Sequence, residues 1–491
     1  MHGFLMDIAR RSVTSSAYNI TANIIQLVVN FCRSVALARL LDPDVFGVFV
    51  FASSIVDLSQ ALADFGLRSA FLQEAIESDQ QEAAKVHFTL STLFSSVWAI
   101  LMIAGAALFV PSEIRWVFWF LTGTGFFFRL THTPRVMLTS RVEFRRLALL
   151  EIISSIVGAV IAIGLAWYGF GLLSLLVPKA ATLLIAVVIF YVIRPVWRPQ
   201  LGWNRALVRQ FLNFGSKVYV NQILLQALDR LDDIWTGAVL GATSLGYYSR
   251  AYKFATYPRI ILSKPLSSVA EGTYAQLRKN RKQLSQAFFR VNALLVRSNF
   301  LLSGILILIA PEFIRIVLGV KWMPMLEAYQ LMLLYTLLDP IKITIANVIT
   351  ISGAPAKVRR ARFLQLIVMI VGLITLGPAF GISGVALAVN LMLVVGISIL
   401  LWQVRAFVDF SLIKLFAAPA LALFVGLLLA RLAIIFPGVL GSDWRTAGVK
   451  IIVFGVVYAG LLILLERRNI PMLFGMLRHL RVSLKLEEND C

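Results

Sequence analysis

The chain is dominated by a succession of apolar stretches, each about as long as a helix needs to be to cross a bilayer. They are expected at residues 13–40, 46–64, 87–110, 114–131, 147–168, 171–193, 214–240, 245–262, 287–310, 328–351, 363–378, 382–404, 413–434 and 447–465. A hydrocarbon core of about 30 Å is crossed by about 20 helical residues, so the pattern predicts an all-α polytopic membrane protein with about 14 transmembrane helices. Hydrophobic residues make up 59% of the 491 residues and charged residues 14%. This balance excludes a soluble enzyme and a disordered chain.

The positions of the basic residues predict the orientation of the chain. The net charge is +21. Clusters of lysine and arginine fall in alternate loops, within 135–146, 194–209, 278–282 and 357–362, and in the C-terminal tail. Because loops rich in Lys and Arg stay in the cytoplasm, both termini are expected there and the number of spans is even. The charge then serves topology and contact with anionic inner-leaflet lipid, not nucleic acid.

Two further segments are expected to lie on the inner leaflet. Lys264–Gln286 and the tail around Leu473–Arg481 both mix apolar side chains with basic ones. That mixture is typical of amphipathic helices in the membrane interface. The alternative is a plain cytosolic loop and an unstructured tail.

An internal repeat appears when the chain is shifted by 199 residues. Residues 30–49 then align with 229–248, and Gly47 falls on Gly246. Each copy holds a polar-studded helix, a tight outer turn and a returning helix. The repeat predicts two homologous lobes, which is a common plan in transporters with a central substrate site. The expected parts are residues 1–195 (spans 1–6), residues 196–405 (spans 7–12) and residues 406–491 (spans 13 and 14 with a basic tail).

Ionisable residues inside the spans mark the candidate substrate site, because such residues are costly in lipid and usually face the bundle interior. The substrate-binding candidates are Arg250, Lys253, Tyr257, Arg297, Lys342 and Lys179. Arg250, Lys253 and Tyr257 are spaced i, i+3, i+7 and are expected to share one helix face. Cationic groups bind phosphate, and aromatic faces suit sugars. The alternative is local pairing, since Lys342 lies three residues from Asp339 and could neutralise it.

Span 2 carries a polar stripe at Asp57, Gln60 and Asp64. Asp57 is a candidate site for a coupling proton or sodium ion, because burial raises the affinity of a carboxyl group for protons. The alternative is that Asp57 pairs with a neighbouring cation. No cofactor and no metal are expected, since the four histidines are scattered and the two cysteines are far apart.

The repeat also predicts an outer gate. It aligns Arg33 with Asp232, which places opposite charges at equivalent depths in the two lobes. We expect an Arg33–Asp232 contact when the outer side is closed, with Asp233 as a substitute partner. The alternative is that each residue pairs within its own lobe.

Four sequence segments carry a resemblance to a known family. They are ARLLDPDVFGVF at 38–49, LADFGLRSAFLQ at 62–73, RVEFRRLALLEIISS at 141–155 and LGYYSRAYKFATYP at 245–258. These resemble the lipid-linked oligosaccharide (Wzx-like) flippases of the multidrug/oligosaccharidyl-lipid/polysaccharide exporter superfamily. The resemblance runs from about Ser12 to Val404. One departure is the loop after span 8, where many relatives have more than one proline and this chain has only Pro265.

The resemblance implies two six-helix lobes around a central cavity and transport by alternating access. It implies movement of an undecaprenyl-diphosphate-linked oligosaccharide across the bacterial inner membrane, for exopolysaccharide, O-antigen or capsule synthesis. A polysaccharide polymerase and glycosyltransferases are the protein partners that it suggests.

Three other functions compete with this interpretation. A cation-coupled multidrug exporter would need acidic binding sites, which the basic candidates disfavour. A membrane polymerase or ligase would need large outer loops and a catalytic constellation, and the sequence shows neither. A passive scaffold would have no use for so many charges inside the membrane. The protein is therefore expected not to be an enzyme.

Overall fold

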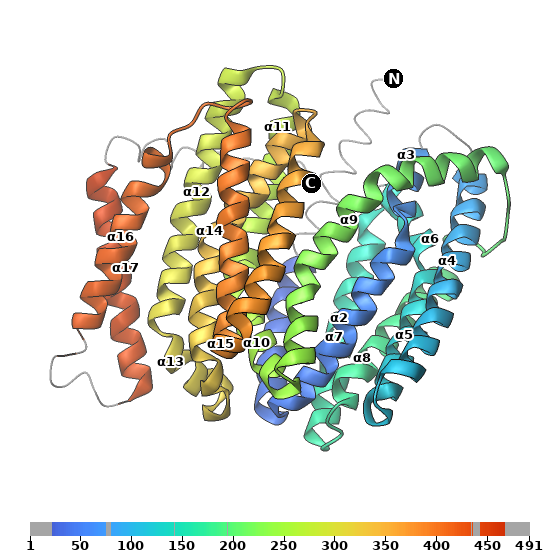
Figure 1. The fold of residues 1–491 in the computed structure, drawn as a ribbon, viewed down its shortest axis with the longest axis horizontal. Helices are drawn as coiled ribbons and strands as arrows, with labels where there is room; N and C mark the ends of the chain where they lie inside the picture. Colours follow the sequence, from blue (N-terminus) through green and yellow to red (C-terminus); the bar gives the residue numbers. More distant parts are fainter. Residues whose placement is uncertain are drawn as a thin grey trace. The chain divides into compact units, whose positions relative to one another are not determined.

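The computed structural model describes residues 22–466 apart from 75–79, 142, 194, 434 and 436–441. Within these residues every regular element is a helix, as the sequence predicts. The chain divides into two compact units, residues 1–246 and residues 247–491. Each unit is described separately (Figure 1).

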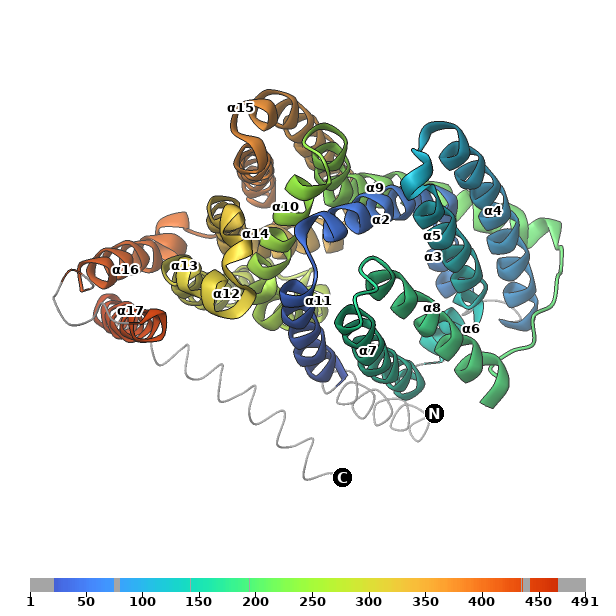
Figure 2. The ribbon, with the colours of Figure 1, turned by 90° about the horizontal axis from the view of Figure 1, so that it is seen from below.

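The first unit is a bundle of long helices with two short ones at one end. It contains Ala22–Leu40, α2 (Pro43–Asp64), α3 (Leu67–Glu74), α4 (Gln80–Phe109), α5 (Ser112–Leu130), α6 (His132–Ser140), α7 (Phe144–Trp167), α8 (Leu173–Val187) with a π-helical end (Val188–Ile193), α9 (Arg205–Val239) and the start of α10 (Ala242–Ala255). The main packing pairs are α2 with α9, α4 with α5, and α7 with α8. Figure 2 shows α7 and α8 side by side.

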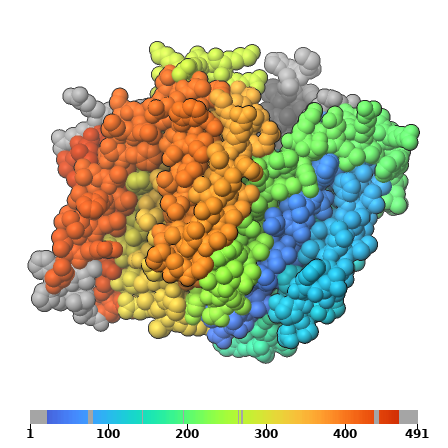
Figure 3. All heavy atoms as spheres, viewed as in Figure 1, coloured from blue at the N-terminus to red at the C-terminus, as the bar shows by residue number. Residues whose placement is uncertain are grey.

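The chain bends sharply where α2 ends. Phe65 and Gly66 have left-handed φ angles of 43° and 69°, so the helix stops and α3 leaves in a new direction. Helix α9 passes directly over this bend, because a Cβ atom on Gly215 would lie 2.2 Å from the Phe65 carbonyl oxygen. The first turns of α9 run across the end of the unit before the helix turns down beside α2, and their side chains lie on the surface at the upper right of Figure 3.

The two copies of the internal repeat meet at a reciprocal helix crossing. Helix α2 begins at Pro43 and α10 at Ala242, which are equivalent positions in the repeat. A Cβ atom on Gly47 would lie 1.7 Å from the Ala242 carbonyl oxygen, and one on Gly246 would lie 1.8 Å from the Pro43 carbonyl oxygen. Such close backbones require glycine at both places. The geometry thus supports the repeat that the sequence suggests.

The second unit is built around α12. It contains the rest of α10, a π-helix (Arg259–Ser263), α11 (Lys264–Leu277), α12 (Arg281–Leu308), α13 (Ala310–Phe313), a second π-helix (Ile314–Leu318), a 3₁₀-helix (Val320–Met325), α14 (Leu326–Ile351), α15 (Pro355–Val404), α16 (Leu412–Leu432) and α17 (Asp443–Leu465). Helix α12 contacts α11, α14, α16 and α17, and its buried residues form the centre of the core.

Helix α15 holds two of the expected spans. Gly381, with a φ angle of 58°, interrupts its helical geometry. A Cβ atom on Gly384 would lie 1.9 Å from the Leu376 carbonyl oxygen, so the two halves pack closely against each other. The expected spans 363–378 and 382–404 therefore lie on either side of this break.

The spans are confirmed as helices, but their exact number is not. Within the described residues, ten helices are long and apolar enough to cross a membrane. Three more expected spans coincide with α5, α9 and α10, which are shorter or carry more charge. The lobe borders at 195/196 and 405/406 stay predictions. By packing, the division falls after Gly246, because α9 lies against α2.

The two expected interfacial segments have different outcomes. Part of the first forms α11, with Tyr274 fully buried against α12. Its contact with a membrane stays a prediction. The second, around Leu473–Arg481, lies outside the described residues.

Candidate functional site

Each unit holds a cluster of charged side chains inside its helical bundle. The first cluster lies between α2 and α9. Arg230 Nη2 is 2.8 Å from Asp57 Oδ2, and its Nη1 is 3.7 Å from Asp233. The Ser54 hydroxyl donates to Asp233 Oδ2 at 3.0 Å. Asp57 thus has the neighbouring cation that the alternative interpretation foresaw, and its role as a coupling site stays a prediction.

Two more residues extend this cluster. The Lys179 ammonium on α8 lies 5.1 Å from the centre of the Phe49 ring on α2. Such a contact stabilises a cation away from water. At the other end of the polar stripe, Asp64 Oδ1 lies 3.6 Å from Arg129 Nη2 on α5. The role of Lys179 in substrate binding stays a prediction.

The second cluster surrounds a single carboxylate, Asp339 on α14. Arg259 Nη1 donates to Asp339 Oδ2 at 2.8 Å, and Lys342 Nζ lies 2.7 Å from Oδ1. The Tyr335 hydroxyl also donates to Oδ1, at 2.9 Å. The Asp339 side chain is 1% exposed, whereas Lys342 is 24% and Arg259 is 21% exposed. The carboxylate is thus buried, and the two cations that it holds remain partly accessible.

This arrangement leaves an excess of positive charge. One carboxylate balances only one of the two cations, and the Nε atom of Arg259 is buried with no hydrogen-bond partner. Lys342 has further N–H donors beyond its contact with Asp339. Arg259 begins a π-helical segment, a form that is frequent at functional sites. The cluster is therefore suited to an anion with several oxygen acceptors.

Sequence reasoning found part of this site. It named Lys342 and its pairing with Asp339, and it missed Arg259. The sequence does contain one signal for Arg259, the proline directly before it. Pro258 indicates that the regular helix ends there, which lets the Arg259 side chain turn toward α14. The partner itself lies 80 residues away, and no local pattern identifies it.

The substrate-binding candidates of α10 and the residues after it differ in burial and in their place relative to the helix. Arg250 and Tyr257 are buried, and Lys253 is partly buried. Helix α10 ends at Ala255, so Tyr257 lies beyond the regular helix on which the shared face was predicted. The Tyr257 ring instead stacks on Phe254, with the centroids 5.9 Å apart. Contact of these residues with substrate stays a prediction.

Arg297 is engaged by a buried contact with Glu466, and its role in substrate binding stays a prediction. Its Nε donates to Glu466 Oε2 at 2.8 Å, and its Nη2 donates to Glu466 Oε1. Its Nη1 donates to the Ala293 carbonyl at 2.8 Å. The guanidinium group is buried and faces the end of α17. These contacts hold the end of α17 against α12.

The predicted gate residues all lie in the first unit. Asp232 is buried on α9. The Arg33 guanidinium lies beside α7, 3.7 Å from the place of a Cβ atom on Gly158. Asp233 is engaged by Ser54 and Arg230, as described above. The Arg33–Asp232 contact stays a prediction.

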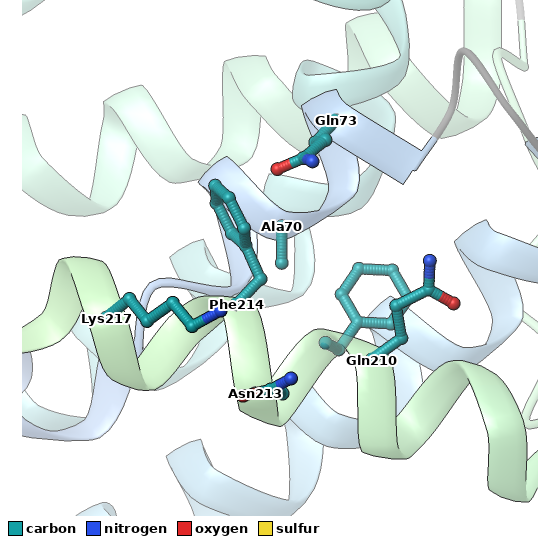
Figure 4. A pocket seen from close by; sticks show the side chains of 7 residues that line it. Ala70, Gln73, Gln210, Asn213, Phe214 and Lys217 are labelled. Carbon is teal, nitrogen blue, oxygen red and sulfur yellow. The ribbon is translucent and has the colours of Figure 1, made fainter. Parts of the chain in front are cut away.

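A small cavity of about 150 Å³ lies between α3 and α9. Figure 4 shows Gln73 of α3 and Gln210, Asn213 and Lys217 of α9 around it. An oligosaccharide needs far more room, because drug-sized ligands already occupy about 300–1,000 Å³. The described residues contain no group of three or more His, Cys, Asp or Glu side chains that could hold a metal ion.

Comparisons with known proteins agree with this geometry. Residues 36–327, more than half of the chain, match the profile of the polysaccharide biosynthesis protein family. The lipopolysaccharide biosynthesis protein WzxC of Escherichia coli (strain K12) is 21% identical over 344 residues, 68% of each chain. The succinoglycan biosynthesis transport protein ExoT of Rhizobium meliloti (strain 1021) is 27% identical over 267 residues, 51% of each chain.

Solved transporters share the fold. The lipid II flippase MurJ in an inward closed conformation superimposes with a TM-score of 0.77 at 18% identity, covering 93% of this chain and 100% of that one. An inward-facing multidrug resistance transporter of the MATE family gives a TM-score of 0.60 at 16% identity, covering 80% and 98%. The chain is thus a multi-pass membrane protein that belongs to the polysaccharide biosynthesis protein family.

Proposed function

We propose that the protein moves an oligosaccharide linked through diphosphate to a polyprenyl lipid from the inner to the outer leaflet of the bacterial inner membrane. The observation that carries this proposal is the Asp339 cluster, where two accessible cations share one buried carboxylate. A diphosphate diester is an anion with several acceptor oxygens, which matches that surplus of charge and donors. The relatives named for lipopolysaccharide and succinoglycan biosynthesis support the same class of substrate.

The residues of the Asp339 cluster are proposed to have different roles in substrate binding. Asp339 is a positioning residue, because it is buried and fixes the two cations by short contacts. Arg259 and Lys342 supply the donors that meet the phosphates. Binding must be reversible for transport, so a partly exposed site suits the task better than a fully enclosed one. Both termini are proposed to lie in the cytoplasm, and the chain is proposed to act without catalysing a reaction.

Coupling to an ion gradient is a second part of the proposal. Asp57 and Asp233 both contact Arg230. Either carboxylate could take up a proton or sodium ion when its contact with Arg230 is broken. Movement of α9 against α2 would open or close this contact, which is one way to link ion binding to the access state.

The experiment is a flipping assay in vesicles with a fluorescent polyprenyl-diphosphate sugar. Arg259→Gln and Lys342→Gln each remove one charged hydrogen-bond donor, so transport at limiting substrate should fall roughly tenfold to a hundredfold. Lys342→Arg should keep more activity than Lys342→Gln. Lys357→Gln, at the start of α15, is the matched control and should transport normally.

Two results would contradict the proposal. One is normal flipping by the Arg259→Gln, Lys342→Gln double variant at normal protein levels. The other is transport of a cationic dye that depends on Asp57, with no flipping of the lipid-linked sugar. The second result would favour the multidrug exporter instead.

A further inference from the structure

The linker before α9 is held firmly against α4. Three contacts hold it: Trp197 against Phe88 with ring centroids 5.4 Å apart, the Gly202 amide to Thr89 Oγ1 at 3.0 Å, and Asn204 Nδ2 to Glu82 Oε1 at 2.7 Å. Asn204 also caps α9 by accepting from two backbone amides. The linker therefore has a fixed course along α4.

Two large apolar side chains point away from this contact. Leu201 is 73% exposed and Trp203 is 63% exposed. They alternate with the residues that hold the linker, so their exposure is imposed by the packing. The exposed apolar face of α4 begins at Leu93, only four residues beyond Thr89, or about 6 Å along the helix. Leu201 and Trp203 thus lie near the edge of the apolar surface, the level at which Trp is enriched in membrane proteins.

A groove beside them combines positive charge with apolar surface. This groove is shallow and open, and every residue that lines it belongs to α9: Arg205, Ala206, Val208, Arg209, Leu212 and Asn213. Arg205 and Arg209 are exposed and lie one helical turn apart. The positive end of the α9 helix dipole lies at the same place.

We propose that this groove binds an anionic phospholipid of the inner leaflet. Arg205 and Arg209 meet the headgroup phosphate, and the partly buried Leu212 lies at the start of the acyl chains. Leu201 and Trp203 enter the interface beside it. The proposal rests on the cytoplasmic orientation proposed for this loop, and it does not depend on which substrate the protein moves.

The site has a mechanical consequence for transport. Helix α9 is continuous from Arg205 to Val239 and carries Arg230 and Asp233 of the first cluster. Arg209 and Arg230 are separated by about 32 Å of helix. A lipid bound at the groove would hold the start of α9 at the inner leaflet. The part of α9 that carries Arg230 and Asp233 would then pivot about that anchored start.

The test is lipid binding to the purified full-length protein, measured by native mass spectrometry with phosphatidylglycerol or phosphatidylcholine. Each arginine near an anionic headgroup contributes roughly a fivefold gain in affinity, so Arg205→Gln with Arg209→Gln should weaken phosphatidylglycerol binding about 25-fold. The matched control is Arg359→Gln with Arg360→Gln, which removes the same charge from exposed positions on α15 and should change binding less than twofold. Leu201→Ser with Trp203→Ser should weaken binding of both lipids.

Three outcomes would overturn the proposal. Equal losses in the two double-arginine variants would mean that net charge alone matters. Equal binding of both lipids by the unaltered protein would mean that no anionic headgroup is recognised. Displacement of phosphatidylglycerol by equimolar undecaprenyl phosphate, lost in the Arg205→Gln, Arg209→Gln variant, would assign the groove to the carrier lipid instead.

Discussion

Substitution of Gly47 by alanine tests the reciprocal crossing of α2 and α10. The added Cβ atom would lie 1.7 Å from the Ala242 carbonyl oxygen. Carbon–oxygen contacts are ordinarily about 3.3 Å or longer, so the two backbones must separate by roughly 1.6 Å. No flexible side chain stands in the way that could move instead, because all three nearest atoms belong to the Ala242 backbone.

The expected cost follows from two opposing effects. Overpacking a tight contact costs about 1–3 kcal/mol, whereas exchange of Gly for Ala inside a helix returns about 1 kcal/mol. Backbone atoms move less easily than side-chain atoms, so the cost should lie at the upper end of that range. We therefore expect a net loss of about 2 kcal/mol in the free energy of unfolding. Gly246→Ala should cost the same, since its Cβ would meet the Pro43 carbonyl at 1.8 Å. The double variant should lose less than the sum, because the first separation makes room for the second methyl group.

The assay is thermal unfolding of the purified protein in detergent. Gly47→Ala and Gly246→Ala should each lower the melting temperature by a similar amount. The matched control is Gly105→Ala on α4, where nothing lies within 4 Å of the added atom, and it should be as stable as the unaltered protein or slightly more so. The reasoning is refuted if Gly47→Ala behaves like Gly105→Ala, or if the two losses add fully.

Three further predictions concern the charged residues. Glu466→Gln should lower stability by about 3–5 kcal/mol in the same unfolding assay, because it leaves the buried Arg297 charge without a counter-charge; a second change, Arg297→Met, should restore part of the loss. Arg33→Asp and Asp232→Arg should each reduce polysaccharide export from cells, and the double swap should recover part of it; no recovery would count against the gate contact. Asp57→Asn should abolish the dependence of vesicle transport on a proton or sodium gradient, and an unchanged dependence would exclude the coupling role.

The sequence was sufficient for features that depend on local pattern. A run of about 20 apolar residues predicts a helix wherever it occurs, because a lipid-exposed backbone must satisfy its own hydrogen bonds. The equivalence of Gly47 and Gly246 was visible as an alignment, and the reciprocal contact follows from that symmetry. The Asp339–Lys342 pair was visible as well, since residues three apart on a helix are neighbours.

Features that depend on which helices meet were not accessible in the same way. Arg297 is predicted to bind substrate because it lies deep in an apolar helix, and that depth alone does not identify its protein partner. Its partner Glu466 lies 169 residues further along, at the end of α17. The assignment of α9 to the second lobe followed from span number, whereas its packing on α2 follows from close contacts such as that of Gly215 with Phe65. Each of these outcomes is decided by tertiary contacts that leave no periodic signal.

The balance of charge within each cluster gives the two units different capacities. In the first, Asp57 and Asp233 contact Arg230, and the Lys179 ammonium extends the cluster, so two cations accompany two carboxylates. In the second, two cations contact the single carboxylate of Asp339. An excess of guanidinium and ammonium favours an anion, so the second cluster is the better candidate for phosphate binding. On the coupling proposed for Asp57, a proton or sodium ion would bind in the first cluster and the anionic lipid in the second, and separate clusters would let each be occupied without neutralising the other.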